Sequence, residues 1–394
     1  MTVLNKTGLN KTGLNAEIRA HFPVTDRMLY LDAAHQTPLA VPVRASLDAF
    51  LDEAQFTAGP KAGWLDRVEQ VRAQLAGLLG VGAGEIAFTK NTSEGLNIAA
   101  HGLRWAPGDN VVLLASEHPN NAYAWLSQRA AGLEVRQVPD DKTWADAETF
   151  AAAVDGRTRA IALSHVMFHS GQRNDVESVV ALARSVGAEV VLDAMQSVGV
   201  LPVDAGALGV AALAAGSHKG LLVPQGLGFL YTATDTDVLA PTYVGTAGVA
   251  NTSDDLVAGP DAVVLRPDAH RFEIGNYNLP AIHALGGALD LLGSIGLPAI
   301  AEHLLDLGDR LIGHLDRLGI GLLGPRERDR RSHIHVLDLP DAGWPPYLAA
   351  SGVRLSPVRD GLRVSFGIYN TAEDVDRLAV IVERGLRTVP ARAS

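Results

Sequence analysis

One apolar run in the middle of the chain ends in an acid, and it constrains the fold more than any other segment. Residues 188–192 read Ala-Glu-Val-Val-Leu and lead directly into Asp193. Short runs rich in β-branched apolar residues are typical of strands that are buried on both faces of a parallel sheet. Open α/β sheets bind ligands beyond the carboxyl ends of their strands. The sequence therefore places the Asp193 carboxylate at a ligand site.

A lysine among small residues follows this strand about 26 residues later. Lys219 stands between His218 and Gly220 and is one of only six lysines in the chain. Pyridoxal 5'-phosphate requires such a pair: an amine of lowered pKa that forms a Schiff base with its aldehyde, and a carboxylate that keeps its pyridine nitrogen protonated. We therefore predict this cofactor, with Lys219 at the aldehyde and Asp193 at the ring. The alternative is a solvated lysine and a capping aspartate.

Composition and charge narrow the class of protein. The chain of 394 residues is 47% hydrophobic and 20% charged, as is usual for globular proteins, and its net charge of -11 opposes binding to nucleic acid or anionic membranes. It has no apolar run of about 18 residues and no apolar signal segment at its N-terminus. The absence of cysteine excludes disulfides and cysteine nucleophiles. We expect a cytoplasmic protein that acts on small molecules, without nucleic acid or membrane partners.

Predicted strands and helices alternate from about residue 30 to residue 235. This alternation indicates an α/β fold with a large, mostly parallel sheet covered on both faces. After Pro260, two long helices, short strands and a last helix indicate a smaller α+β unit. We therefore predict a flexible tail at residues 1–20, a large cofactor-binding domain at residues 21–258, whose first residues are free to pack on the small domain, and a small C-terminal domain at residues 259–394.

A hydroxyl-rich segment follows the predicted strand at residues 85–89. Thr92 and Ser93 stand at the start of the next predicted helix, where free backbone N–H groups and hydroxyls together favour a phosphate. The alternative is an ordinary capping box that includes Glu94. The glycine-rich residues 80–84 are not a dinucleotide fingerprint, because the third glycine is missing and a strand follows them instead of preceding them.

Several histidines lie near predicted strand ends. His118 follows a strand at residues 111–115, where an imidazole can lie on a pyridine ring and transfer protons. His35 follows another strand and is either a substrate contact or a polar turn residue. Two pairs have the spacing of metal ligands, His165 with His169 and His333 with His335. The spacing of His165 and His169 suits a helix, but this segment is a predicted strand end without an acid for a third ligand. His333 and His335 share one face of a predicted strand. We interpret both pairs as structural and predict no metal site.

Together these motifs resemble the fold-type-I pyridoxal-phosphate enzymes of the class V aminotransferase group, which includes cysteine desulfurases, selenocysteine lyases and isopenicillin N epimerase-like proteins. The resemblance extends from Tyr30 to about Arg387. It implies that His118 stacks on the cofactor ring, that Gln196 contacts its phenolic oxygen and that Lys219 carries the aldimine. It also implies a phosphate site made of Thr92, Ser93, Ser217 and His218, completed by Asn276 of the neighbouring subunit. A homodimer with its active site at the subunit interface follows from the same resemblance.

The last third of the chain carries the implied substrate site. Arg363 resembles the arginine that clamps the substrate carboxylate, and a guanidinium suits this role because it binds carboxylates bidentately. The alternative for Arg363 is a surface salt bridge. Further possible substrate contacts are His35, His169, Tyr277, Arg354 and Arg359. Such a surplus of contacts indicates a larger substrate or one with a second carboxylate.

Two departures from the family pattern bear on the reaction. The loop at residues 353–357 lacks the cysteine of desulfurases, which excludes persulfide transfer. Phe168 stands where an asparagine often contacts the phenolic oxygen, so that hydrogen bond must come from Gln196, His169 or a water. We predict an aminotransferase or a C–S lyase acting by β-elimination. The alternatives are an epimerase or a decarboxylating deaminase, and more remotely a regulator that binds the cofactor without catalysis.

Overall fold

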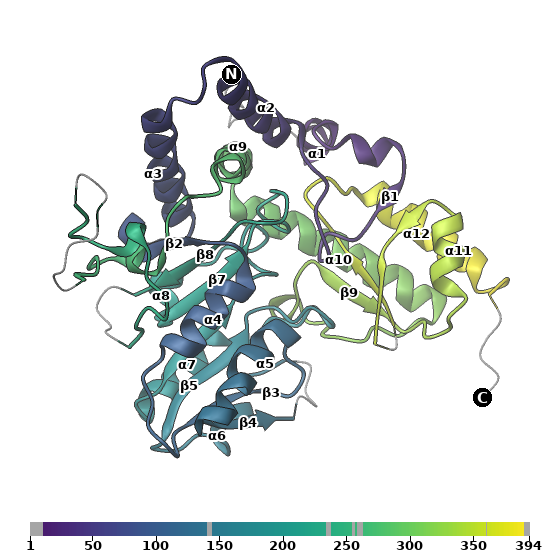
Figure 1. The fold of residues 1–394 in the computed structure, drawn as a ribbon. Coiled ribbons are helices and arrows are strands. Elements are labelled where there is room, and N and C mark those ends of the chain that lie inside the picture. Colours follow the sequence, from purple (N-terminus) through teal and green to yellow (C-terminus); the bar gives the residue numbers. More distant parts are fainter. Residues whose placement is uncertain are drawn as a thin grey trace.

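The computed structural model describes residues 11–139, 144–233, 238–253, 257, 263–359 and 361–389. A large sheet flanked by helices forms one side of the molecule, and a smaller group of helices and strands built from the end of the chain lies beside it (Figure 1). We call the second group the C-terminal unit and define it as α10 to α12 together with β9, β11 and β12.

The large sheet has seven strands in the order β2-β8-β7-β6-β5-β3-β4. All neighbours are parallel except at β8, which runs antiparallel to both β2 and β7. The bounds of its strands are β2 Ile86–Thr89, β3 Asn110–Leu114, β4 Glu134–Val138, β5 Thr158–Ser164, β6 Glu189–Asp193, β7 Ala212–Gly216 and β8 Gly228–Thr232. The predicted α/β fold with a mostly parallel sheet is confirmed.

Both faces of this sheet are buried, and for this reason its strands read as nearly continuous apolar runs. Alternate residues of β3 enter different parts of the core: Val111 packs with α4 and α5 on one face, and Val112 packs with α7 on the other. The helices α4 Thr92–Gly102 and α5 Pro119–Leu126 cover the first face, and α7 Val176–Ser185 covers the second. Gly95 lets α4 approach β7 closely, since a Cβ there would lie 2.8 Å from Ala214 Cβ.

Three long helices pack together beside the sheet, namely α2 Val41–Phe56, α3 Lys61–Leu78 and α9 Leu279–Ile295 (Figure 1). The shorter helices of the large unit are α6 Ala147–Ala151 and α8 Ala205–Leu208. Within the described part of the chain, no single helix has the length and hydropathy of a membrane span. The helices α9 and α10 meet that criterion only when taken together, across a bend of 75°.

The C-terminal unit packs α10 Leu297–Leu318, α11 Trp344–Ala350 and α12 Ala372–Gly385 with a small antiparallel sheet of order β11-β12-β9. Its strands are β9 Ile334–Leu337, β11 Ser356–Val358 and β12 Gly361–Ser365. The start of the chain joins this unit, because β1 Leu29–Tyr30 pairs in parallel with β10 Val353–Arg354 and Asp32 forms a bridge with Ser365. The boundary between the predicted domains at residue 258 stays a prediction.

The N-terminus differs from the predicted flexible tail. Helix α1 spans Lys11–Ala20, and its last turn packs on the C-terminal unit. Ile18 is buried there, and Arg19 donates hydrogen bonds to the Asp374 carboxylate at 2.7 and 3.2 Å. A tail was therefore the wrong prediction for residues 11–20, because distant residues near the end of the chain supply the partners. Residues 1–10 lie outside the described residues.

Candidate active site

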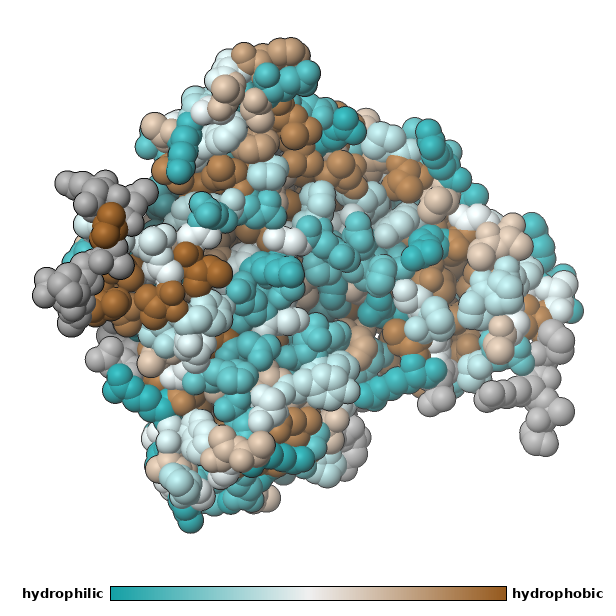
Figure 2. Space-filling view, in the orientation of Figure 1, coloured by the Kyte–Doolittle hydropathy of each residue, from teal (hydrophilic) through white to brown (hydrophobic). Residues whose placement is uncertain are grey.

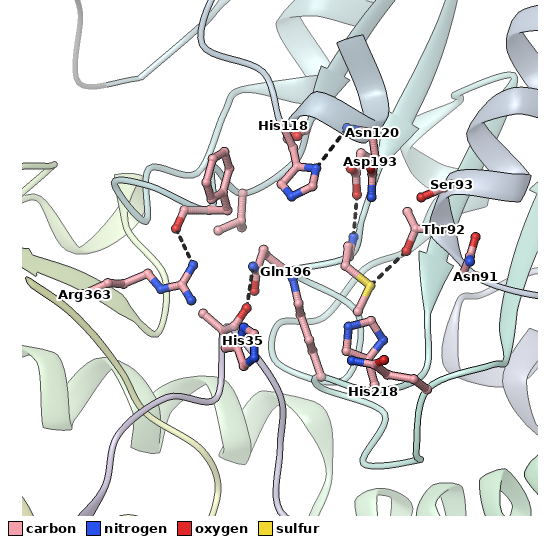
Figure 3. Close-up of a pocket in the computed structure, with 17 residues that line it drawn as sticks. His35, Asn91, Thr92, Ser93, His118, Asn120, Asp193, Gln196, His218 and Arg363 are labelled. Carbon is pink, nitrogen blue, oxygen red and sulfur yellow. Dashed lines mark hydrogen bonds between the residues drawn. The ribbon is translucent and has the colours of Figure 1, made fainter. Parts of the chain in front are cut away.

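A cavity of about 410 Å³ opens at the carboxyl ends of the central strands. Figure 3 shows Arg363 on one side of it, Thr92 and Ser93 on the other, and Asp193 and Gln196 between them. In the space-filling view, hydrophilic side chains gather over the middle of the molecule, between the sheet and the C-terminal unit (Figure 2). The fold thus brings together side chains that are far apart in the sequence, at the place where parallel sheets bind ligands.

Lys219 and Asp193 face this cavity and influence each other's charge. Asp193 ends β6, and its carboxylate accepts a hydrogen bond from the backbone N–H of Met195 at 2.9 Å. Burial lowers the pKa of Lys219 to about 8; the nearby Asp193 opposes this shift and the positive charge of Arg363 adds to it. Burial also raises the pKa of Asp193 above its usual range. With this pKa, about one tenth of Lys219 is a free amine at pH 7.

His118 lies above the middle of the cavity as the N-cap of α5. Its Nδ1 accepts the backbone N–H of Asn120 at 3.1 Å, so the proton of the neutral ring is on Nε2. The edge of the Phe168 ring packs against it, with ring centres 4.8 Å apart. Burial, aided by the charges of Lys219 and Arg363, lowers the pKa of His118 to about 4, and the imidazole is neutral at pH 7.

The end of the cavity opposite Arg363 is built from the first turn of α4. Asn91 caps this helix by accepting the backbone N–H of Glu94 at 2.9 Å. The Thr92 hydroxyl lies 3.0 Å from the sulfur of Met195, and Ser93 also lines the cavity. Free N–H groups of a helical first turn together with two hydroxyls suit an anion such as phosphate. The cap comes from Asn91, and the Glu94 carboxylate accepts the backbone N–H of Lys90, so Thr92 and Ser93 stay available to an anion.

Arg363 closes the other end of the cavity. Its guanidinium is buried and donates a hydrogen bond to the carbonyl of Phe168 at 3.1 Å. A fully buried carboxylate, Asp32, lies 3.6 Å away and accepts hydrogen bonds from the Ser356 hydroxyl at 2.8 and 3.0 Å. Arg363 is thus not part of a surface salt bridge. Its guanidinium faces the cavity as a cation with room for an anionic partner.

Most of the predicted site residues lie in this cavity. Those that line it are His35, Thr92, Ser93, His118, Asp193, Gln196, His218, Lys219 and Arg363. Gln196 donates to the carbonyl of Ala34 at 3.0 Å, and its Oε1 is buried without a hydrogen-bond partner among the described residues. Of the predicted protein partners for the phenolic oxygen, Gln196 lines the cavity and His169 does not.

Tyr277 and the exposed Arg359 do not line this cavity, and four more predicted residues also lie elsewhere. The Ser217 hydroxyl is within 3.2 Å of the Pro224 and Leu227 carbonyls, which satisfy it outside the cavity. Asn276 lines a separate cavity with Lys90 and Glu94, on the far side of the start of α4. His169 is buried behind Phe168, and Arg354 points largely into solvent, 3.4 Å from Asp32. The roles assigned to these four residues remain predictions.

Some residues of the site escaped the sequence analysis. The cavity is also lined by Asn91, Asn120, Ser164, Val166, Met195 and Gln225. Two buried acids lie just behind it: Asp32, next to Arg363, and Glu117, whose pKa burial raises to about 7. Each follows a predicted strand, and a histidine stands directly after Glu117 and three residues after Asp32. This position was the only signal in the sequence that could have marked the two acids. Among the described residues, no group of three potential ligands could hold a metal ion.

The cavity fits pyridoxal 5'-phosphate by the chemistry of its side chains. An amine of lowered pKa and a buried carboxylate face it, and a helix N-terminus with two hydroxyls forms one end. The unpartnered Oε1 of Gln196 marks a place that a polar group of a ligand would fill. Within this arrangement, Thr92, Ser93 and His218 would hold the phosphate, and Asp193 would pair with the ring nitrogen.

This fold and site define a pyridoxal-phosphate-dependent enzyme of fold type I. The sequence profile of the family described as aminotransferase class-V matches residues 29–378. The chain belongs to this family. Over 92% of each chain it is 37% identical to an uncharacterized aminotransferase, C777.03c, of Schizosaccharomyces pombe. It is 34% identical to a probable cysteine desulfurase of Methanothermobacter thermautotrophicus, over 75% of this chain and 74% of the relative.

The fold is also similar to that of a solved relative. The structure of apo cysteine desulfurase from Thermococcus onnurineus NA1 superposes with a TM-score of 0.86 over 95% of this chain and 98% of that chain, at 24% identity. The predicted fold type, the predicted family, the enzymatic character and the predicted cofactor are thereby confirmed. The reaction is a separate question.

Proposed function

We propose that this protein removes the proton from Cα of an amino acid whose carboxylate is bound by Arg363, and that it acts as an aminotransferase. The observation that carries the proposal is the placement of Lys219 and Arg363 in one cavity, where the charge of Arg363 helps to lower the pKa of the lysine to about 8. A base must be partly unprotonated at the working pH and must lie close to the proton that it removes. Lys219 meets the first condition, and the shared cavity provides for the second.

Each side chain has a task that its surroundings support. The guanidinium of Arg363 holds the amino acid by its carboxylate and so orients the Cα–H bond toward Lys219. Lys219 takes up the proton and can return it at a neighbouring atom. The neutral ring of His118 covers the site, and the Asp193 carboxylate provides a counter-charge for a protonated ring nitrogen. When bound, pyridoxal 5'-phosphate supplies an electron sink for the charge left on Cα.

Two fates of the deprotonated amino acid remain as candidates. Aminotransfer requires that Lys219 return the proton to an atom other than Cα, and the aminotransferase name of the relative that is 37% identical supports this choice. Loss of a sulfur leaving group from Cβ is the second candidate, supported by the relative named as a probable cysteine desulfurase. This second route is a β-elimination rather than a desulfuration through a protein persulfide, because the chain contains no cysteine.

The test is to mix the purified holoenzyme with a panel of amino acids and cysteine S-conjugates while recording its visible spectrum and assaying pyruvate and ammonia. Conversion of the cofactor to its amine form without pyruvate supports aminotransfer. Release of pyruvate and ammonia from an S-conjugate supports the lyase instead. Failure of every amino acid to exchange its Cα hydrogen with deuterated solvent would refute both.

Replacing Arg363 with lysine should raise KM for the amino acid by about 10- to 100-fold, because an ammonium group cannot form the bidentate pair that a guanidinium forms. The affinity for the cofactor should stay within about twofold, since Arg363 lies at the opposite end of the cavity from α4. Steady-state kinetics and cofactor titration measure the two quantities. Arg44→Lys, at an exposed arginine of α2 that pairs with Asp48, is the matched control and should change KM far less.

We also propose that two copies form a dimer in which Asn276 reaches the partner's phosphate site. Apolar side chains are exposed in the segment that carries it, namely Tyr243, Val244, Val264 and Ile274. Figure 2 shows apolar surface at the left of the view, where Figure 1 places the green segment after β8. Asn276 itself has the left-handed backbone conformation, with φ of 48°, which fixes the turn at the tip of this segment. Sedimentation of the holoenzyme should give the mass of two chains, and the mass of one chain would exclude this arrangement.

A further inference from the structure

A buried carboxylate directly before His118 has no part in the proposed chemistry. Glu117 follows β3, is 6% exposed and does not line the cavity. The next residue, His118, lines the cavity and caps α5. A buried acid is costly unless its oxygens are satisfied, so its partners indicate why the fold keeps it.

The oxygens of Glu117 join the end of β3 to the end of β5. One oxygen accepts the backbone N–H of Ser164 at 2.7 Å, and the other accepts the Ser164 hydroxyl at 2.6 Å. The second oxygen also accepts the side-chain amide of Asn121 at 3.1 Å, one turn into α5. All three contacts are donated to the carboxylate, which is an acceptor-only group when ionised.

Both ends of this bridge belong to the site. Ser164 is the last residue of β5, lines the cavity and is aligned with Asp193 on the neighbouring strand. At the other end, the carbonyl of His118 accepts the backbone N–H of Asn121 at 2.9 Å, so holding Asn121 also holds the histidine backbone. The carboxylate therefore links the backbone around His118 to the strand that lies next to Asp193.

We propose that Glu117 is a positioning residue that sets the orientation of the His118 ring over the cofactor and thereby the rate of Cα proton transfer. The part of this inference that concerns the rate of proton transfer rests on the proposed function. The part that concerns the orientation of the ring does not. A glutamine at this position keeps the size of the side chain. Its amide nitrogen cannot accept a hydrogen bond, so at least one of the three donors must lose its partner.

The first measurement is made without substrate. The circular dichroism of the cofactor's visible band reports the asymmetry of its surroundings, and Glu117→Gln should change this signal while binding the cofactor within about tenfold of wild type. The matched control is Asp109→Asn, at another buried carboxylate, which lies beside the opposite end of β3 and pairs with Arg159 at 2.7 Å. This control should leave the signal unchanged. An unaltered signal in Glu117→Gln would overturn the proposal.

The second measurement is a double-mutant cycle on the exchange of the Cα hydrogen with deuterated solvent, followed by NMR. If Glu117 acts through His118, Glu117→Gln should slow exchange about tenfold in the wild-type background and less than about twofold in His118→Ala. Equal factors in both backgrounds would show that Glu117 does not act through the histidine and would overturn the proposal. If the wild type exchanges no amino acid, the proposed function fails, and the dichroism still tests the positioning of the ring.

Discussion

Replacing Lys219 with alanine should slow the exchange of the Cα hydrogen of a bound amino acid by about 10³-fold, the range expected when the only base at a reacting centre is removed. Burial lowers the pKa of this lysine to about 8, which keeps a usable fraction of the free amine at neutral pH. Two other cavity-lining groups that could accept a proton, His118 and His218, are weaker bases, since burial lowers their pKa values to about 4. Exchange measured by NMR in deuterated buffer gives the rate directly.

The matched control for this variant is Lys61→Ala, which removes an exposed lysine at the start of α3. It should exchange like the wild type. Lys219→Ala should still bind pyridoxal 5'-phosphate through the α4 end of the cavity, and a cofactor titration checks that the site is intact. If turnover survives in Lys219→Ala with the cofactor bound, the assignment of Lys219 as the proton carrier is wrong.

The protein should lose about 6 kcal/mol of its free energy of unfolding between pH 7 and pH 5 through three buried histidines alone. These are His165, His333 and His335, and burial lowers the pKa of each to about 3. In the unfolded chain a histidine titrates near 6.5, so below that pH the unfolded state binds protons that the folded state refuses. This loss of unfolding free energy is absent above about pH 6.5 and reaches about 2 kcal/mol per histidine at pH 5.

A single substitution isolates this effect from the titration of the acids. His335→Leu removes one of the three histidines. The difference in free energy of unfolding, variant minus wild type, should be about 2 kcal/mol larger at pH 5 than at pH 7. Urea unfolding at the two pH values measures the difference. His101→Leu, at an exposed histidine of α4, should follow the wild type at both. An equal response of His335→Leu and His101→Leu to pH would contradict the prediction.

Much of the fold and the centre of the site could be predicted because they depend on local patterns. Strands buried on both faces have apolar centres, so β3, β5 and β6 were recognisable from their runs of apolar residues. Asp193 and Lys219 could be paired because a strand end and a loop lysine are uncommon places for those charges. Placement of the motifs on a parallel sheet then brought Thr92 and His118 to the same edge.

The rest depended on contacts between distant parts of the chain. Asp32 is significant only because Arg363 and Ser356 pack against it, and nothing in the sequence near Asp32 predicts those partners. Glu117 is marked by hydrogen bonds to Ser164 that only the neighbouring strands of the sheet make possible. Helix α1 is held on the C-terminal unit in part by the ion pair of Arg19 with Asp374, a partner 355 residues away in the sequence.

The bridge between the start of the chain and its end has a consequence for the order in which the molecule is made. β1 finds its partner only when β10 exists, more than 300 residues later, and β2 must wait for β8, about 140 residues later. On a ribosome the strands β2 to β8 can assemble while the chain is still growing, whereas the pairing of β1 with β10 and the contact of Asp32 with Arg363 form last. Folding should therefore complete the cofactor end of the cavity before the end that holds the substrate carboxylate, so that selectivity for the amino acid is the last property the nascent protein acquires.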